Sequence, residues 1–334
     1  MRKYIWNDTW YFGANFVPST AINQLEMWQP DTFDPKTIRR ELGYAAKIGM
    51  NLMRVFLHDL LFEQDPAGFL DRIDEYLRIS DSLGIKTAFV FFDDCWNADF
   101  QLGKQPDPRP GTHNSGWLES PGSKAADDLS QRPRLERYVK TVMSRFAHDP
   151  RIVLWDLYNE PGNTVLDFEK GIVRCNASLP LLKDIFRWAK EVSPDQPFTA
   201  APYNFEAKFD DLNRFMFENS EVISFHAYNP PAELQERIHF MRLIADGRPL
   251  LCSEYMARTV GSTFKECLPL LKKNQVSAIN WGLVSGKTQT TLPWAYLMET
   301  ADLSIPFHDI FHADGTFLVP EEEQIFAGLA DKEQ

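Results

Sequence analysis

Residues 151–161 have the sequence Arg151-Ile-Val-Leu-Trp-Asp-Leu-Tyr-Asn-Glu-Pro161. Residues 152–157 are predicted to form a buried strand, which ends in the polar pair Asn159-Glu160 and is stopped by Pro161. An apolar run of this kind is typical of a parallel strand that helices cover on both faces. Its last residues then stand at the carboxyl end of the sheet, where such folds place their chemistry. Glu160 is therefore a candidate functional carboxylate, and an ordinary solvated strand-end residue is the alternative.

Strand and helix patterns alternate along the whole chain. The strands are predicted at residues 10–17, 51–58, 86–92, 152–157, 197–203, 222–229, 249–256 and 278–284. The first helix has clear limits, because Asp34 and Pro35 are typical of a helix start and Gly49 of its end. Eight such units in one uninterrupted chain predict a single-domain (β/α)₈ TIM barrel over residues 1–334. An open doubly wound sheet is the alternative, but no GxGxxG motif follows the first strand.

The composition excludes several classes of partner. The net charge of −12 over 334 residues argues against a nucleic-acid partner, since phosphates need a basic surface. The N-terminus lacks the pattern of a signal peptide, and no stretch approaches the roughly 18 apolar residues of a membrane span. We therefore expect a cytoplasmic protein without a membrane partner, unless a leader has been trimmed. The oligomeric state is left open.

Metal and cofactor sites are not predicted. The four cysteines are widely spaced and form no CxxC motif, so neither a metal site nor a disulfide framework is expected. The histidines lack metal-ligand spacing, and most are interpreted as surface or loop residues: His58, His113, His308 and His312. The aromatic content of 13% favours a ligand-binding cleft, because aromatic faces stack on sugars and bases alike.

The carboxyl ends of all eight strands face one rim of a barrel. The residues expected there are Asn15, Arg54, Asp93, Asp94, Asn159, Glu160, His226, Tyr228, Glu254 and Trp281. Glu254 ends an apolar strand in the same way as Glu160, and strands four and seven lie on opposite sides of the barrel. Two inward glutamates could bracket a substrate bond. Hydrolysis of a glycosidic bond needs such a pair, one as acid and one as nucleophile or base.

Several motifs resemble one known group of enzymes. These are Tyr158-Asn-Glu-Pro161, Ser253-Glu-Tyr255, Trp281, Arg54 and His226-Ala-Tyr228. Together they resemble the clan A retaining glycoside hydrolases, and most of all the family-5 cellulase and mannanase group. The resemblance spans about residues 10 to 330. It implies cleavage of β-glycosidic bonds in oligo- or polysaccharides without a cofactor.

The resemblance also implies roles for the rim residues. Glu160 would be the acid/base, which requires an environment that raises its pKa, and Glu254 would be the nucleophile. Asn159 would bind the sugar 2-hydroxyl. Arg54 and Tyr228 would keep Glu254 ionised and oriented.

Two further rim residues complete the predicted substrate site. His226 would contact substrate, and Trp281 would be the floor on which the reacting sugar stacks. The carboxyl groups of the two glutamates should lie about 5–5.5 Å apart, with retention of the anomeric configuration.

The end of strand three departs from the family pattern. The family usually has a histidine there, whereas this sequence has Asp93-Asp94-Cys95-Trp96. Asp94 could bind sugar hydroxyls bidentately, as carboxylates do, and a loop cap or turn is the alternative. Trp96 could be a sugar platform or a core residue, and the same alternatives hold for Trp28, Trp117 and Trp294.

A long irregular segment, residues 95–132, follows strand three. Such loops are usually functional or disordered, and its two tryptophans argue against disorder. We expect it to lie over the carboxyl-end rim, to wall off one side of the cleft and to favour exo-action or short oligosaccharides.

Three alternatives to a glycosidase are carried forward. A transglycosylase would use the same two glutamates with an acceptor site that excludes water. A catalytically silent carbohydrate-binding barrel is disfavoured, because a binder has no need of two opposed carboxylates. A metal-dependent hydrolase barrel is disfavoured by the lack of an HxH motif on strand one.

Overall fold

The computed structural model describes residue 6, residues 9–163 and residues 177–330. Its centre is one eight-stranded sheet in which every paired neighbour is parallel, in the order β5-β4-β3-β2-β1-β8-β7-β6. The strands are β1 Phe12–Asn15, β2 Leu52–Phe56, β3 Lys86–Asp93, β4 Ile152–Asn159, β5 Phe198–Ala201, β6 Ile223–His226, β7 Leu250–Glu254 and β8 Val276–Trp281. This arrangement confirms the predicted (β/α)₈ fold.

The two edges of the sheet meet between β5 and β6. The backbone N–H of Glu221 donates to the carbonyl of Phe198 at 2.8 Å, and the hydroxyls of Thr199 and Ser224 lie 2.7 Å apart. Both hydroxyl groups are buried, so their mutual hydrogen bond satisfies polar atoms that would otherwise be costly inside the barrel. The barrel is therefore closed at this seam by a short set of polar contacts.

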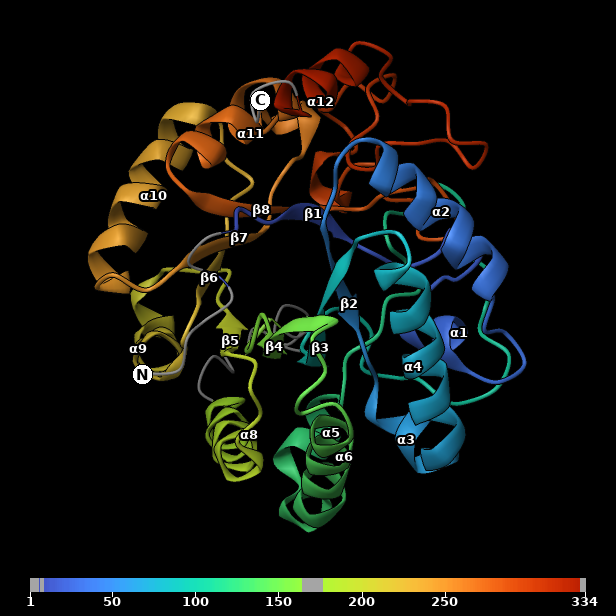
Figure 1. Cartoon of the computed structure of the whole chain (residues 1–334), viewed down its shortest axis with the longest axis vertical. Helices are drawn as coiled ribbons and strands as arrows, with labels where there is room; N and C mark the ends of the chain where they lie inside the picture. The colour runs from blue at the N-terminus through green and yellow to red at the C-terminus, as the bar shows by residue number, and fades with distance from the viewer. Residues whose placement is uncertain (1–5, 7–8, 164–176, 331–334) are drawn as a thin grey trace.

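Helices surround the strands on all sides (Figure 1). They are α1 Gln24–Trp28, α2 Pro35–Lys47, α3 Asp59–Gln64, α4 Pro66–Asp81, α5 Ser123–Asp127, α6 Arg132–Arg145, α8 Leu179–Val192, α9 Asp210–Asn219, α10 Pro231–Ala245, α11 Phe264–Lys273 and α12 Glu322–Ala330. The start of α2 is as predicted, because the Asp34 carboxylate accepts from the N–H groups of Lys36 and Thr37. Within the described residues, no helix combines the length and hydrophobicity needed to cross a membrane.

Two of the histidines that were predicted to be surface or loop residues lie in loops but are buried. His58 is fully buried at the start of α3, where its imidazole accepts from the N–H of Leu60 at 3.2 Å. His308 is 1% exposed, and burial lowers its pKa well below the usual range. Both lie in connections that pack against the barrel, which the polarity of a single residue does not reveal.

The floor of the barrel is apolar and closed. Leu52, Leu154 and Leu251 are buried there in one hydrophobic cluster. Trp6 joins this cluster, and its indole N–H donates to the carbonyl of Val153 at 2.9 Å. Because apolar side chains fill this end of the barrel, the polar residues gather at the opposite, carboxyl end of the strands.

Candidate active site

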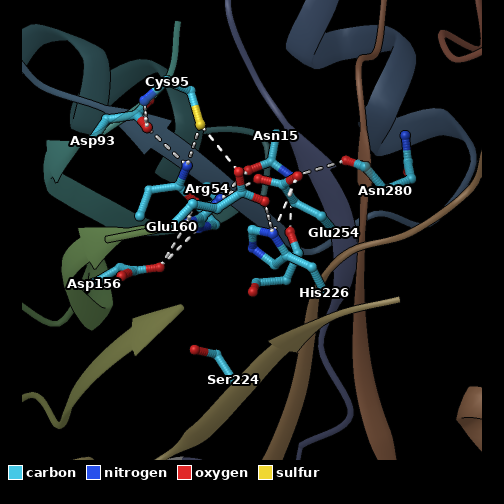
Figure 2. A network of polar contacts seen from close by, with 12 residues as sticks. Asn15, Arg54, Asp93, Cys95, Asp156, Glu160, Ser224, His226, Glu254 and Asn280 are labelled. Atoms are coloured by element: carbon cyan, nitrogen blue, oxygen red, sulfur yellow. Dashed lines mark hydrogen bonds and ion pairs between the residues drawn. The ribbon is translucent and has the colours of Figure 1, made fainter. Parts of the chain in front are cut away.

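Arg54 is the centre of a buried polar network at the carboxyl end of the barrel (Figure 2). Its guanidinium donates to Asp156 at 2.9 Å and to Asn15 at 2.8 Å. It also donates to Glu254 at 3.2 Å and to Asn159 at 2.6 Å. Burial alone would lower the pKa of Arg54, but the charges of Asp156 and Glu254 raise it. Arg54 therefore stays cationic and fixes four side chains from β1, β4 and β7.

The two candidate catalytic glutamates face each other across this network. Glu160 directly follows β4, and Glu254 is the last residue of β7. One carboxylate oxygen from each, together with Nδ1 of His226, lies within 4.8 Å of the others. This spacing is close to the roughly 5–5.5 Å typical of retaining glycosidases and below the roughly 6.5–9.5 Å of inverting ones.

Glu160 is held by three side chains. His226 Nδ1 lies 2.6 Å from Oε1, while Asn163 Nδ2 donates to Oε2 at 2.6 Å and the Cys95 thiol donates to it at 3.0 Å. The backbone of Glu160 is in the left-handed region, with φ of +45°. Strained non-glycine residues of this kind persist only where their surroundings hold them, and they cluster at functional sites. The contacts from Cys95 and Asn163 were not predicted.

Glu254 has the neighbours that the family resemblance implies. The Tyr228 hydroxyl donates to Oε2 at 2.7 Å, and Arg54 approaches Oε1 at 3.2 Å. His226 Nδ1 lies 3.4 Å from Oε2, so the imidazole spans both glutamates. These contacts fix the position of the carboxylate and supply two donors to its charged form.

The contacts favour ionisation of Glu160 before Glu254. Burial opposes ionisation of Glu160, but the hydrogen bond and charge of His226, with the bonds from Cys95 and Asn163, lower its pKa overall. Burial raises the pKa of Glu254, and the neighbouring charge of Glu160 raises it further. The charges of His226 and Arg54 lower this pKa, but the net shift is upward. This order is opposite to the expectation that the environment raises the pKa of Glu160. The reason is that His226 lies closer to Glu160 than to Glu254.

Asp93 connects the network to residues 95–132. Its carboxylate accepts from Asn159 Nδ2 at 2.9 Å and from the Trp117 indole at 2.8 Å. The backbone N–H of Cys95 donates to the same carboxylate at 3.0 Å. Burial raises the pKa of Asp93 well above its usual range. Since Asn159 also accepts from Arg54, both ends of its amide are held and its orientation is fixed.

Asp94 is hydrogen-bonded to residues in and after β4 rather than to the two glutamates. It is 1% exposed and accepts from Tyr158 Oη at 2.7 Å, from the N–H of Gly162 at 2.6 Å and from Ser178 Oγ at 2.5 Å. These bonds tie the connections on either side of β4 together. They favour a structural role for Asp94, and the sugar-binding role remains a prediction.

The tryptophans differ in their surroundings. Trp28 is fully buried and donates to the carbonyl of Phe56 at 2.9 Å, so it is a core residue. Trp96 and Trp281 are half-buried beside a cluster that includes Trp117. Trp294 is half-buried, and its ring lies 5.1 Å from that of Tyr228. Trp294 thus stands beside Tyr228, which contacts Glu254, while Trp281 ends β8 at the same rim.

The glutamate pair and His226 could also hold a metal ion. Two carboxylates and an imidazole with atoms within 4.8 Å of one another are ligands that zinc accepts. Arg54 already places a positive charge 3.2 Å from Glu254, which would compete with a cation. The expectation that the site works without a metal stays a prediction.

Comparisons with known proteins support the resemblance. No protein-family model matches the chain. The chain is 23% identical over 214 residues to mannan endo-1,4-beta-mannosidase A of Podospora anserina. The aligned region covers 56% of this chain and 50% of that protein. The match thus spans only half the length of this curated relative.

Solved structures match over nearly the whole chain. The endo-1,4-beta-D-mannanase of Thermotoga petrophila has a TM-score of 0.59 at 14% identity, covering 96% of this chain and 99% of that one. The GH5_18 structure from Streptomyces cattleya in complex with GlcNAc has a TM-score of 0.63 at 12% identity, covering 98% and 81%. At these identities the likeness is one of fold, and it agrees with the resemblance to the family-5 group.

Proposed function

We propose that the protein is a retaining β-glycoside hydrolase of clan A, with Glu160 as acid/base and Glu254 as nucleophile. The observation that carries this proposal is the pairing of the two glutamates at the carboxyl end of the barrel, within 4.8 Å of each other through one oxygen each. The similarity to mannanases makes β-1,4-linked mannosides the first substrates to test.

In the first step Glu254 attacks the anomeric carbon and forms a glycosyl ester, while the bond to the leaving oxygen breaks. Glu160 gives its proton to that oxygen. In the second step Glu160 takes a proton from water, the water oxygen bonds to the anomeric carbon, and the ester bond to Glu254 breaks. Arg54 and Tyr228, which contact Glu254 at 3.2 and 2.7 Å, stabilise the carboxylate as it regains its charge.

The first step requires Glu160 to be protonated while Glu254 is ionised. The contacts of His226 favour the opposite placement, because its Nδ1 lies 2.6 Å from Glu160 and 3.4 Å from Glu254. If His226 moved its hydrogen bond from Glu160 to Glu254, Glu254 would ionise before Glu160. We propose that substrate binding causes this movement, since the leaving oxygen must approach Glu160.

Replacement of the nucleophile tests the proposal. Glu254→Ala should lower kcat by on the order of 10⁴-fold or more, as for other nucleophiles that act within a catalytic unit. Turnover would be measured on nitrophenyl β-mannoside, β-glucoside, β-xyloside and β-N-acetylglucosaminide, and on the matching oligosaccharides. Thermal unfolding of the variant checks that the barrel is intact.

The results separate the alternatives. Near-normal activity of Glu254→Ala would show that the nucleophile is another group. Binding of sugars without turnover by the wild-type protein would favour the catalytically silent barrel. Transfer products that outnumber hydrolysis products would favour the transglycosylase.

A further inference from the structure

Three aromatic rings close one side of the site. Phe56 ends β2, Trp281 ends β8, and Trp117 comes from the segment that follows β3. The ring of Trp117 lies 5.0 Å from Phe56 at 84° and 5.4 Å from Trp281 at 76°. These edge-to-face contacts are a favourable arrangement for aromatic rings. We call the three residues the aromatic wall.

Trp117 is held firmly within this wall. Its side chain is 2% exposed, and its indole N–H donates to Asp93 at 2.8 Å. The neighbouring residues are bound to α1, since Asn23 Nδ2 donates to the carbonyl of Gly116 at 3.0 Å and Gln24 Nε2 donates to that of Leu118 at 2.9 Å. A tryptophan with so many fixed neighbours cannot swing aside without breaking buried hydrogen bonds.

The same segment is also joined to the connection that follows β8. The N–H of Asn114 donates to the carbonyl of Thr288 at 2.8 Å, and Gln289 Nε2 donates to that of Arg109 at 2.8 Å. His113 Nδ1 lies 2.7 Å from the carbonyl oxygen of Leu292. The wall is therefore supported on both flanks, from β1–α1 and from the connection after β8.

Very little space remains behind the wall. The cavity lined by Phe56, Trp117, Trp281 and Asp309 measures about 10 Å³, which is roughly the room of a single water molecule. A pyranose ring does not fit into it. This cavity therefore cannot hold a further sugar of the chain.

The orientation of the reacting sugar in the barrel determines which substrates the site accepts. If Glu160 protonates the leaving oxygen, the bond that breaks lies on the β4 side of the reacting sugar. β8 lies across the barrel from β4, so the other end of that sugar points toward Trp281 and the aromatic wall. Resting on the proposed function, we infer that the enzyme is exo-acting: it accepts only a terminal, non-reducing sugar and releases it as a monosaccharide.

Paired nitrophenyl substrates test this inference on the wild-type enzyme. The pairs are nitrophenyl β-mannoside with β-mannobioside and nitrophenyl β-glucoside with β-cellobioside. The monoside should release nitrophenol at once, whereas the bioside should release it only after a lag, because its terminal sugar must leave first. Reducing-end-labelled mannotetraose or cellotetraose should shorten by one sugar at a time.

The outcomes separate this inference from the proposed function. Immediate nitrophenol from the bioside, with disaccharide as first product, would overturn exo-action and leave the glycosidase intact. No cleavage of monosides, biosides or tetrasaccharides would count against the glycosidase, and the exo inference would fall with it.

Variants of Trp117 identify the barrier. Trp117→Ala opens the wall and should raise the ratio of disaccharide to monosaccharide product by about 10-fold or more, on the scale of discrimination by a shaped pocket. Trp117→Phe keeps a ring and should stay near the wild-type ratio. Because the ratio compares two products of one preparation, a partly unfolded variant does not distort it. If Trp117→Ala folds and gives the wild-type product ratio, Trp117 is not the barrier. If that variant does not fold, the products of the wild-type enzyme on the paired substrates still decide whether the enzyme is exo-acting.

Discussion

At the scale of single residues, His226 is the group that touches both glutamates. It lowers the pKa of Glu160 by hydrogen bonding and by charge, and it lowers that of Glu254 by charge. Tyr228 lowers only the pKa of Glu254, through its hydrogen bond. If Glu254 must be ionised and Glu160 protonated, His226 therefore acts on both limbs of the kcat/KM profile, whereas Tyr228 acts only on the limb that Glu254 sets.

His226→Ala should move the whole kcat/KM profile to higher pH. In the free protein Glu160 ionises first and sets the acidic limb, and Glu254 sets the basic limb. Loss of the imidazole raises the pKa of both carboxyl groups, so both limbs move up. The matched variant Tyr228→Phe should raise only the pKa of Glu254 and therefore move only the basic limb up. A pH profile on one nitrophenyl glycoside checks both. A downward shift for His226→Ala would contradict this account of the pair.

Replacement of the acid/base should depend on the leaving group. Glu160→Ala removes proton donation, which natural glycosides need and nitrophenyl glycosides with a good leaving group need little. The first step should therefore slow by about 10²- to 10⁴-fold more on natural substrates. Azide should rescue the second step and give a glycosyl azide. Equal losses on both substrates without rescue would assign the proton to another residue.

The residues of the site were predictable in part. Glu160, Glu254, Arg54 and Tyr228 follow from motifs at strand ends, and the structure brings them together. Asp156 was missed although a signal exists, because a carboxylate within the apolar run of β4 needs a buried partner such as Arg54. Cys95 and Asn163 contact Glu160 only through loop geometry, which no strand or helix period reports.

At the scale of elements, the limits of the longer helices were the most predictable feature. Asp34 caps α2 and Gly49 follows its end with φ of +83°, as the sequence indicates. The short helices α1 and α3 were not predicted, because five or six residues are too few to show a helical period. Six of the predicted strands were too long, since apolar residues continue beyond their hydrogen-bonded parts. The other two, β3 and β4, extend to Asp93 and Asn159, beyond their predicted ends at residues 92 and 157.

Asp309, in the connection after β8, should make stability depend on pH. It is 1% exposed and accepts from Thr290 Oγ1 at 2.8 Å, and burial raises its pKa from 3.8 to about 6. Because the folded pKa lies above the unfolded one, its favourable contribution is full below about pH 4 and is lost as the pH rises through about 6.

Asp309→Asn should remove this loss. Asparagine keeps an oxygen acceptor for Thr290, and it tolerates the left-handed backbone at this position, where φ is +41°. Relative to the wild type, the variant should gain up to ~3 kcal/mol in unfolding free energy between pH 4 and pH 7. Urea unfolding at both pH values measures the difference. If the difference in unfolding free energy between the variant and the wild type is the same at both pH values, ionisation of Asp309 costs the folded protein little stability.

At the scale of the whole molecule, barrel topology determines which residues can meet. The amino-terminal end is filled by an apolar cluster that includes Trp6 and Leu154, so polar groups collect at the other end. Closure of the sheet places β4 across from β8 and next to β3 and β5. Glu160 and Glu254 are 94 residues apart in sequence, since 254 − 160 = 94, and only the closed barrel brings them into one site.

The stereochemistry of the reaction follows from that geometry. One oxygen of Glu160 lies within 4.8 Å of one oxygen of Glu254, and a pair at this spacing leaves no room for a water between carboxylate and sugar. On the proposed function, Glu254 then attacks the anomeric carbon itself, and water later opens the ester from the same face. Two displacements on one carbon restore the original configuration, so the first product should be the β-anomer.

Proton NMR of the product in the first minutes, before mutarotation, measures this outcome. An activated 2-fluoro sugar slows both steps, and the glycosyl ester should then accumulate on Glu254 as a mass increase of one sugar. Glu254→Ala is the matched control and should not be labelled, whereas Glu160→Ala should still be labelled because a good leaving group needs no acid. An α-anomer as first product would mean that the carboxylates separate to about 6.5–9.5 Å when substrate binds, and that water attacks directly.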